Sequence, residues 1–191
     1  MHRFEDLLKN RRSVRNFQDR PVPEKTIRAI IQESILAPSS GNEQSWRFVI
    51  VSDTGFMADI SRDCKQTLLN RIDKTPNDYA KKYRPILSKP DYNIFYNAPA
   101  LVYILGVKEL KNSEINCTLA ASYFMFSAVN RNLGTCWISF AKFVKDDAIK
   151  KRLGLDPELF IVAPIIIGYP GKIPAAPPRK EADILKVIRH P

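Results

Sequence analysis

Hydrophobic positions along the chain predict an ordered series of helices and strands. Isoleucines recur at helical spacing between residues 27 and 35, which predicts a helix with Pro23 near its first turn and a stop at Ala37-Pro38. Near-continuous apolar runs at 99–107 and 159–170 are typical of strands buried on both faces. Further helices are expected at 4–10, 56–72, about 114–132 and about 146–152, further strands at 46–52 and 134–140, and an irregular stretch at 73–97.

The order of these elements is neither a regular strand–helix alternation nor all helical. It predicts an α+β fold in which one central sheet is flanked by helices. We expect residues 1–191 to form a single domain, because this length and a hydrophobic fraction of 45% suffice for one substantial core. The tail, about 171–191, is proline-rich and then amphipathic, with few apolar residues of its own. We expect it to lie over another surface, such as a second subunit.

Several classes of protein are disfavoured by what the chain lacks. No run approaches the ~20 apolar residues of a membrane span, and the charged N-terminus is expected to belong to the fold. Cys64, Cys117 and Cys136 are scattered, which indicates a reducing compartment such as the cytoplasm and argues against zinc. His2 and His190 stand at the termini, so we expect no histidine-based metal site or catalytic triad.

The formal net charge of +10 fits nucleic acid, an anionic membrane or a phosphorylated small molecule as a partner. Much of the excess is dispersed, which is typical of a solvated surface. No nucleic-acid motif is present, and basic and aromatic residues are not interleaved as stacking platforms require. We therefore expect no nucleic acid and no membrane as a partner, and keep a basic nucleic-acid-binding module as a distant alternative.

The most concentrated charge lies in "RRSVRNF", residues 11–17. If this segment is extended, alternation puts Arg11, Ser13 and Arg15 on one face and Arg12 and Val14 on the other. Two guanidinium groups with a hydroxyl between them suit a phosphate monoester. The alternative is a solvated basic turn.

A second polar stretch, "APSSGNEQSW" at 37–46, gathers small hydrogen-bonding side chains around Gly41. Such a loop can bind the edge of a heterocycle, or simply connect a helix to a strand. No GxGxxG follows a strand and no GxxxxGK[ST] occurs, and no paired acids or nucleophile–histidine pair emerges. The chain thus has groups that can donate hydrogen bonds to a phosphate but no evident catalytic acid–base pair. This combination indicates that a bound cofactor carries the chemistry.

Taken in order, "RRSVRNF", "APSSGNEQSWRFVIV", "LGTCWISF", "IIIGYP" and the late "PPRK" resemble the nitroreductase family of FMN-dependent oxidoreductases. The resemblance runs over nearly the whole chain. It implies a mixed or antiparallel sheet flanked by helices and an intertwined homodimer. It also implies ping-pong transfer of a hydride from NADH or NADPH, through flavin N5, to a small nitroaromatic, quinone or similar electrophile, with no fixed catalytic side chain and no metal.

The resemblance also assigns residues to the flavin. It assigns the binding of the flavin phosphate and ribityl chain to the arginine–serine segment at 11–15, and it implies that a basic residue late in the chain also contacts the phosphate. The 38–44 loop of the other subunit and the segment near 137–139 approach the ring. The implied cofactor-binding residues are Arg11, Arg12, Ser13, Arg15, Pro38, Ser39, Ser40, Asn42, Gln44, Trp137, Ile138, Ser139 and Arg179, with Lys180 as an alternative to Arg179.

The chain departs from the family pattern at a few positions. Ser45 stands where relatives often have proline, Ser139-Phe140 follows "WI" where glycine is frequent, and Asn116 and Tyr123 replace an aspartate and an amide. We expect these changes to affect the substrate pocket more than the cofactor. Aromatic residues in or beside 73–97 are candidates for a lid, and the simpler expectation is a loop packed on the surface: these residues are Tyr79, Tyr83, Phe95 and Tyr96. For Trp137, Phe140 and Tyr123 the simpler expectation is core packing, and Cys136 is expected to be buried.

Other activities fit the same resemblance. Some relatives dehalogenate, oxidise peptide heterocycles or consume the flavin itself. The electron donor is alternatively an acidic protein such as ferredoxin, which a basic surface would suit. A non-catalytic flavin-binding protein is a further alternative, for which Ser139-Phe140 blocking the ring is the rationale.

Overall fold

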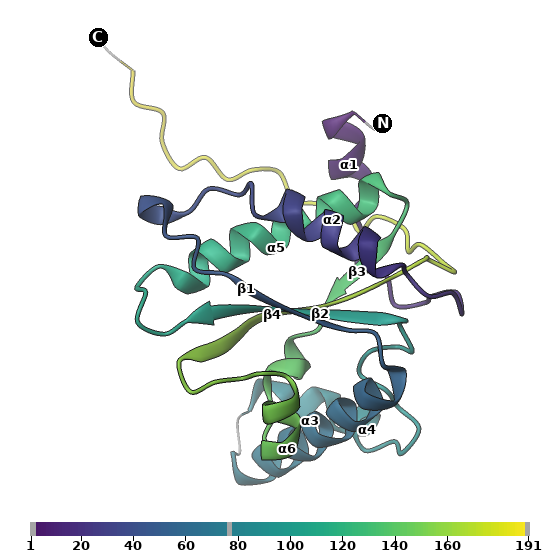
Figure 1. Cartoon of the computed structure of the whole chain (residues 1–191). Helices are drawn as coiled ribbons and strands as arrows, with labels where there is room; N and C mark the ends of the chain where they lie inside the picture. Colours follow the sequence, from purple (N-terminus) through teal and green to yellow (C-terminus); the bar gives the residue numbers. More distant parts are fainter. Residues whose placement is uncertain (1–2, 76–77, 190–191) are drawn as a thin grey trace.

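A computed structural model describes residues 3–75 and 78–189 of the chain (Figure 1). Both histidines, His2 and His190, lie outside the described residues. The helices are α1 (Phe4–Asn10), α2 (Glu24–Ser34), α3 (Thr54–Lys74), α4 (Arg84–Leu87), α5 (Ser113–Asn130) and α6 (Asp147–Arg152), with short 3₁₀ turns η1 (Ser40–Asn42), η2 (Tyr79–Tyr83) and η3 (Ser139–Lys142). The strands are β1 (Arg47–Val51), β2 (Ala100–Val107), β3 (Gly134–Trp137) and β4 (Leu159–Gly168).

The four strands form one antiparallel sheet in the order β1-β2-β4-β3. The two apolar runs predicted as buried strands, β2 and β4, pair at its centre, with a register shift after Ile104. Their side chains alternate between two cores, so Tyr103 faces one layer of helices and Val102 the other. The prediction of an α+β fold with a central antiparallel sheet flanked by helices is confirmed.

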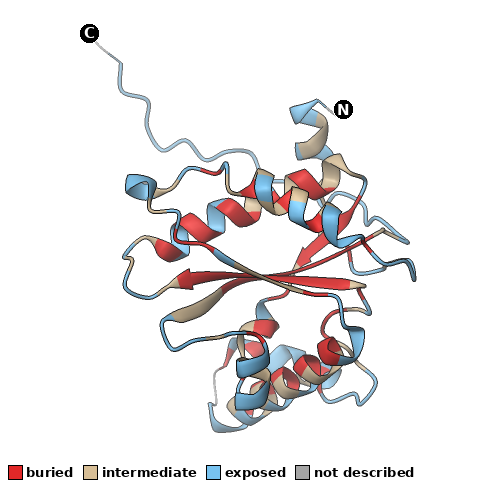
Figure 2. Ribbon diagram, in the orientation of Figure 1, coloured by how far each residue is buried: buried red, intermediate tan, exposed pale blue. Residues whose placement is uncertain are grey.

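Each face of the sheet is covered by a separate layer of helices (Figures 1 and 2). On one face lies α3, whose buried residues include Ile60, Cys64 and Leu68. On the other face, α2 and α5 pack against each other and against the sheet. The predicted helices at 4–10, 114–132 and 146–152 are found within one or two residues of their expected ends, and α3 extends to Lys74.

Three predicted elements differ from the structure. The stretch 73–97, expected to be irregular, contains η2 and the short helix α4, whose first turn accommodates Pro85. The strand expected at 134–140 ends at Trp137 and is followed by η3, which places Ala141 in the core. The carbonyl of Ala141 accepts a hydrogen bond from the hydroxyl of Tyr103 at 3.3 Å.

The tail has no helix or strand over 171–189, although an amphipathic pattern was expected near its end. Its apolar side chains are exposed, because the tail leaves the body of the chain (Figure 1): Ile173, Ile184, Leu185, Val187 and Ile188.

No helix of residues 3–75 or 78–189 is both long enough and apolar enough to span a bilayer.

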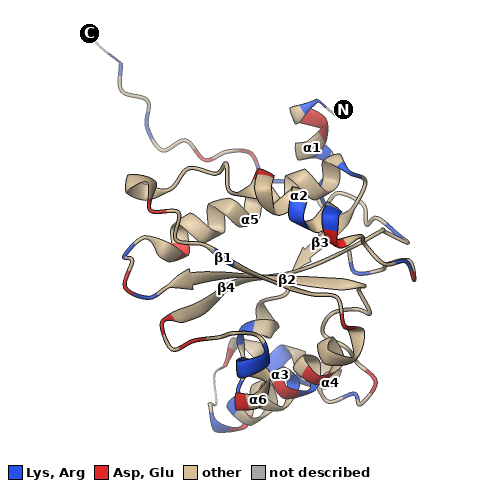
Figure 3. Ribbon diagram, in the orientation of Figure 1, with Lys and Arg blue, Asp and Glu red and all other residues tan. Residues whose placement is uncertain are grey.

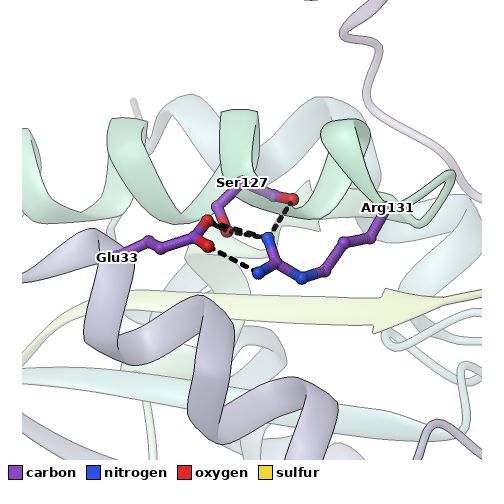
Figure 4. A network of polar contacts seen from close by, with 3 residues as sticks. All are labelled: Glu33, Ser127 and Arg131. Atoms are coloured by element: carbon purple, nitrogen blue, oxygen red, sulfur yellow. Dashed lines mark hydrogen bonds and ion pairs between the residues drawn. The ribbon is translucent and has the colours of Figure 1, made fainter. Parts of the chain in front are cut away.

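A polar network connects α2 to α5 within the layer that these two helices form (Figure 4). Arg131 donates to both carboxylate oxygens of Glu33, at 2.7 and 2.5 Å, and the hydroxyl of Ser127 donates to the same carboxylate at 2.5 Å. These hydrogen bonds, with the charge of Arg131, hold the pKa of Glu33 below its ordinary value. The network joins the last turn of α2 to the C-terminal end of α5.

We predict that Glu33→Gln lowers the free energy of unfolding by about 1 kcal/mol at pH 7, the scale of a partly exposed charge-assisted hydrogen bond. A carboxyl pKa that is lower in the folded state stabilises the fold above the unfolded-state pKa. This stabilisation is lost as the pH falls through the folded-state pKa. Urea unfolding at pH 7 and at pH 3 measures both effects. Glu24→Gln, which removes only the exposed pair with Arg28, is the matched control; an equal loss in the two variants would contradict the prediction.

Candidate cofactor site at the edge of the sheet

The arginine-rich segment runs along the outer edge of the sheet, beside β3. The backbone N–H of Val14 donates to the carbonyl of Thr135 at 2.9 Å, and Ser13 forms a parallel bridge with Thr135. Gly134 permits this approach, because a Cβ at this position would lie 2.8 Å from the side chain of Val14. The segment is therefore held in an extended conformation by β3.

The pockets that these side chains line agree with the expected alternation along this segment. Burial raises the pKa of the Cys136 thiol, and the charges of Arg15 and Arg11 and the hydroxyl of Ser13 offset part of that rise. Arg15 lines one pocket. Arg12 and Val14 instead line a separate pocket at the C-terminal end of α5. The segment thus presents cations on both of its faces.

The three arginines of this segment have no acidic partners among the ion pairs of the described residues. Arg12 donates to the carbonyl of Arg11 at 2.6 Å, and Arg15 lies 5.8 Å from the centre of the Tyr96 ring. Positive charges that no carboxylate neutralises suit a dense anion such as a phosphate.

Arg15 also lines a pocket of about 250 Å³ that contains several aromatic rings. Three of the four lid candidates are here. Phe95 is fully buried in the core, so it is part neither of a lid nor of a surface loop. Of the described residues that line this pocket, Arg15 alone is charged. The other lining residues are Tyr79, Tyr83, Ile94, Tyr96, Trp137, Ile138, Ser139 and Phe140.

The chain after β3 brings the predicted ring-contacting residues to this pocket. Ile138 is buried, Trp137 is half-buried and Ser139 is exposed. The ring of Phe140 meets that of Tyr83 edge to face, with 5.2 Å between ring centroids. Phe140 therefore narrows the pocket from one side, as its bulk relative to glycine suggests, while it also contacts η2.

The polar loop at 38–44 lies at the other end of α5. Its backbone N–H at Ser40 donates to the side-chain oxygen of Asn116 at 3.0 Å, and Asn112 donates to the hydroxyl of Ser40 at 3.0 Å. Asn42 and Gln44 are exposed and hydrogen bond to each other at 3.1 Å. The sequence marked Asn116 as a departure near the substrate pocket, but the structure shows that it supports this loop.

The two motifs do not meet within one chain. Asn116 lies near the start of α5, whereas Val129, near its end, lines the pocket that holds Arg12 and Val14. Thirteen helical residues separate the two, which corresponds to about 20 Å along the helix axis. The predicted cofactor residues therefore form two groups at opposite ends of α5.

The last predicted residue, Arg179, lies exposed in the tail, as does Lys180. The structure brings neither of them to the arginine segment.

The expected core packing of Tyr123 is wrong for this chain. Tyr123 is 44% exposed, and with Ile115 and Leu119 it forms an apolar stripe at helical spacing on the outer face of α5. Phe4 and Leu8 of α1 are exposed as well. Helical spacing alone did not distinguish this outer stripe from the buried face of α5, because α5 is apolar nearly all round.

The sequence model of the Nitroreductase family matches residues 8–169. The chain belongs to the nitroreductase family. It is 26% identical over 182 residues to an iodotyrosine deiodinase of Thermotoga neapolitana, covering 94% of this chain and 95% of the relative. It is 27% identical over 194 residues to a 4-nitrobenzoate reductase of Pseudomonas putida, covering 87% and 85%.

The fold agrees with this family. A nitroreductase of Bacteroides fragilis, solved with bound FMN, superimposes with a TM-score of 0.82 at 22% identity, covering 98% of this chain and all of that one. The match confirms the nitroreductase-like fold predicted from the sequence.

The thiols of this nitroreductase-family protein are all buried. Burial raises the pKa of Cys117 to about 11 and also raises the pKa of Cys64 and of Cys136. We therefore predict that a disulfide reagent labels the thiols of the native protein slowly at pH 8. On denaturation, three equivalents of the coloured product of the reagent should be released per chain. Fast labelling of one native thiol would contradict the assignment of the cysteines to packing.

Proposed function

We propose that this protein is an FMN-dependent oxidoreductase that acts as a homodimer. It takes electrons from NADH or NADPH and passes them to a small nitroaromatic, quinone or similar electrophile. The observation that carries the proposal is the group of arginines without carboxylate partners, Arg11, Arg12 and Arg15, beside an aromatic pocket in a member of the nitroreductase family. FMN bound by the nitroreductase of Bacteroides fragilis supports the choice of cofactor.

The residues present suit FMN. Arg11 and Ser13 would hold the phosphate through charge-assisted hydrogen bonds, and Arg15 would hold the ribityl side of the ring. Arg12, on the opposite face of the segment, would add positive charge to the same site. Trp137, Ile138 and Ser139 would lie against the ring. When bound, FMN supplies the group that accepts and donates the hydride. The aromatic side chains of the pocket exclude water and offer flat surfaces to a planar substrate, and no metal is required.

A second copy of the chain completes the proposed site. Because the 38–44 loop lies about 20 Å from the arginines along α5, Pro38, Ser39, Ser40, Asn42 and Gln44 would reach the flavin bound by the partner subunit. The exposed apolar stripe of α5 supports such an interface. The tail, about 171–191, would cross the partner and bring Arg179 to the phosphate. We propose one domain per subunit and a cytoplasmic location.

Reductive dehalogenation is the second candidate reaction. It is favoured by the match to the Thermotoga neapolitana iodotyrosine deiodinase over nearly the full length of both chains. Release of halide from a halogenated phenol by the flavin-loaded protein, in place of nitro-group reduction, would select it. An acidic protein remains the alternative electron donor, although lysine and arginine are scattered among acidic residues on both layers rather than gathered on one face (Figure 3).

We predict that the purified protein has flavin absorption bands and that NADH or NADPH bleaches them under anaerobic conditions.

The double variant Arg11→Ala/Arg15→Ala should bind FMN at least about 100-fold more weakly, because two charge-assisted hydrogen bonds are lost. Titration of apoprotein with FMN, followed by fluorescence, measures the change.

The control for this variant is Arg28→Ala/Arg62→Ala, which removes the same charge from two exposed arginines that pair with acids. Unchanged FMN affinity in the Arg11→Ala/Arg15→Ala variant would refute the site. If the protein binds flavin but neither NADH nor NADPH reduces it, the assignment of the cofactor site stands and another protein is favoured as the electron donor.

We also predict that Phe140→Ala lowers the KM for bulky electrophiles several-fold, since it opens the aromatic pocket, and leaves flavin content unchanged. Steady-state kinetics with a small and a bulky quinone measure this difference. Phe143→Ala, three residues further along and not part of the pocket lining, is the control. Equal effects on the two quinones would mean that Phe140 only supports the fold.

A further inference from the structure

The side-chain amide of Asn116 is the centre of a small buried network beneath the polar loop. Asn116 is 1% exposed. Its oxygen accepts from the backbone N–H of Ser40 at 3.0 Å, and its nitrogen donates to the carboxylate of Glu43 at 2.9 Å and to the hydroxyl of Ser45 at 3.3 Å. One side chain of α5 thus contacts the beginning, the middle and the end of the loop.

The loop needs such support because its backbone is strained. Asn42 and Gln44 have φ angles of 56° and 46°, in the left-handed region that non-glycine residues avoid, and Gly41 precedes them with φ 56°. Hydrogen bonds within the loop, from Gln44 N–H to the hydroxyl of Ser39 and from Gln44 to Asn42, close the turn without attaching it to the fold. The contacts with Asn116 attach it to α5, and Asn112, the residue before α5, adds one further hydrogen bond to the hydroxyl of Ser40.

An amide is the group that this network requires. It accepts from a backbone N–H with one atom and donates to a carboxylate with the other, whereas an ionised aspartate accepts only. With aspartate at position 116, a second carboxylate would lie beside that of Glu43. The resemblance drawn from the sequence marks Asn116 and Ser45 as departures, and the structure shows them in contact. The two departures therefore belong to one local arrangement with Glu43.

We propose that Asn116 is a positioning residue, which together with Glu43 and Ser45 holds Asn42 and Gln44 in the orientation that contacts the flavin of a partner subunit. This inference rests on the proposed function. Asn116 itself does not touch the flavin. Its contribution is to keep the strained loop in one conformation before the cofactor binds.

Three variants test the network through the affinity of apoprotein for FMN. Asn116→Ala and Asn116→Asp should each weaken FMN binding about tenfold, the scale of one lost buried hydrogen bond. Adding Glu43→Gln to Asn116→Asp should restore most of the affinity, because the exchanged pair keeps one donor and one acceptor facing each other. Gln66→Ala, which removes an exposed amide on α3, is the control and should leave the affinity unchanged.

Rescue separates positioning from a general loss of stability. If Asn116 only supports the fold, the two single variants lower the melting temperature of the apoprotein but bind FMN normally well below it. That outcome would overturn the proposal. Failure of Glu43→Gln to rescue Asn116→Asp would overturn the part assigned to Glu43.

Mixed dimers test whether the loop acts on the partner's flavin. One copy carries Arg11→Ala/Arg15→Ala, and the other carries Asn116→Ala. If the loop serves the partner, one site holds both defects and the other site holds neither, so at FMN concentrations that saturate only the wild-type site the mixed dimer binds half the wild-type flavin. If the loop acts within its own chain, both sites are defective and this tight binding is lost, which would overturn the proposal.

Wild-type protein is measured first in every series. If it takes up no FMN, the proposed function itself has failed. If it binds FMN and the Asn116 variants bind equally well, only the positioning role has failed.

Discussion

The pairing of β2 with β4 is the constraint on which the other elements depend. Both strands are buried on both faces, so each face requires its own layer of helices. The α3 layer and the α2–α5 layer satisfy this requirement. The sheet edge at β3 then remains open to the arginine segment, which pairs with it through Val14 and Thr135. The candidate site follows from this edge.

Charge and shape act together at that edge. The guanidinium groups of Arg11, Arg12 and Arg15 are held in place by an extended backbone rather than by acidic partners. Next to them the chain after β3 contributes Trp137 and Phe140 to an aromatic pocket. A cofactor with an anionic end and a flat end would satisfy both features, which is why FMN suits the residues better than either a phosphate or a planar substrate alone.

The long helix α5 explains why one chain holds only part of the proposed site. Its C-terminal end lies beside the arginine segment, and its first turns hold the loop through Asn116. Between these ends, Ile115, Leu119 and Tyr123 expose an apolar stripe. A two-fold dimer through this stripe would place the loop of one copy near the arginines of the other, so interface and site would be the same structural feature.

The sequence by itself determined the longer helices, the buried strands and the alternation of the arginine segment, because these follow from local spacing and from burial on one or two faces. The motifs also identified the family correctly. Contacts between distant segments were decided only by the tertiary structure. After β3 the chain turns and packs Ala141 against Tyr103, and Asn116 hydrogen bonds to Ser40, Glu43 and Ser45, about 70 residues away. Such contacts exist only once the layers have packed.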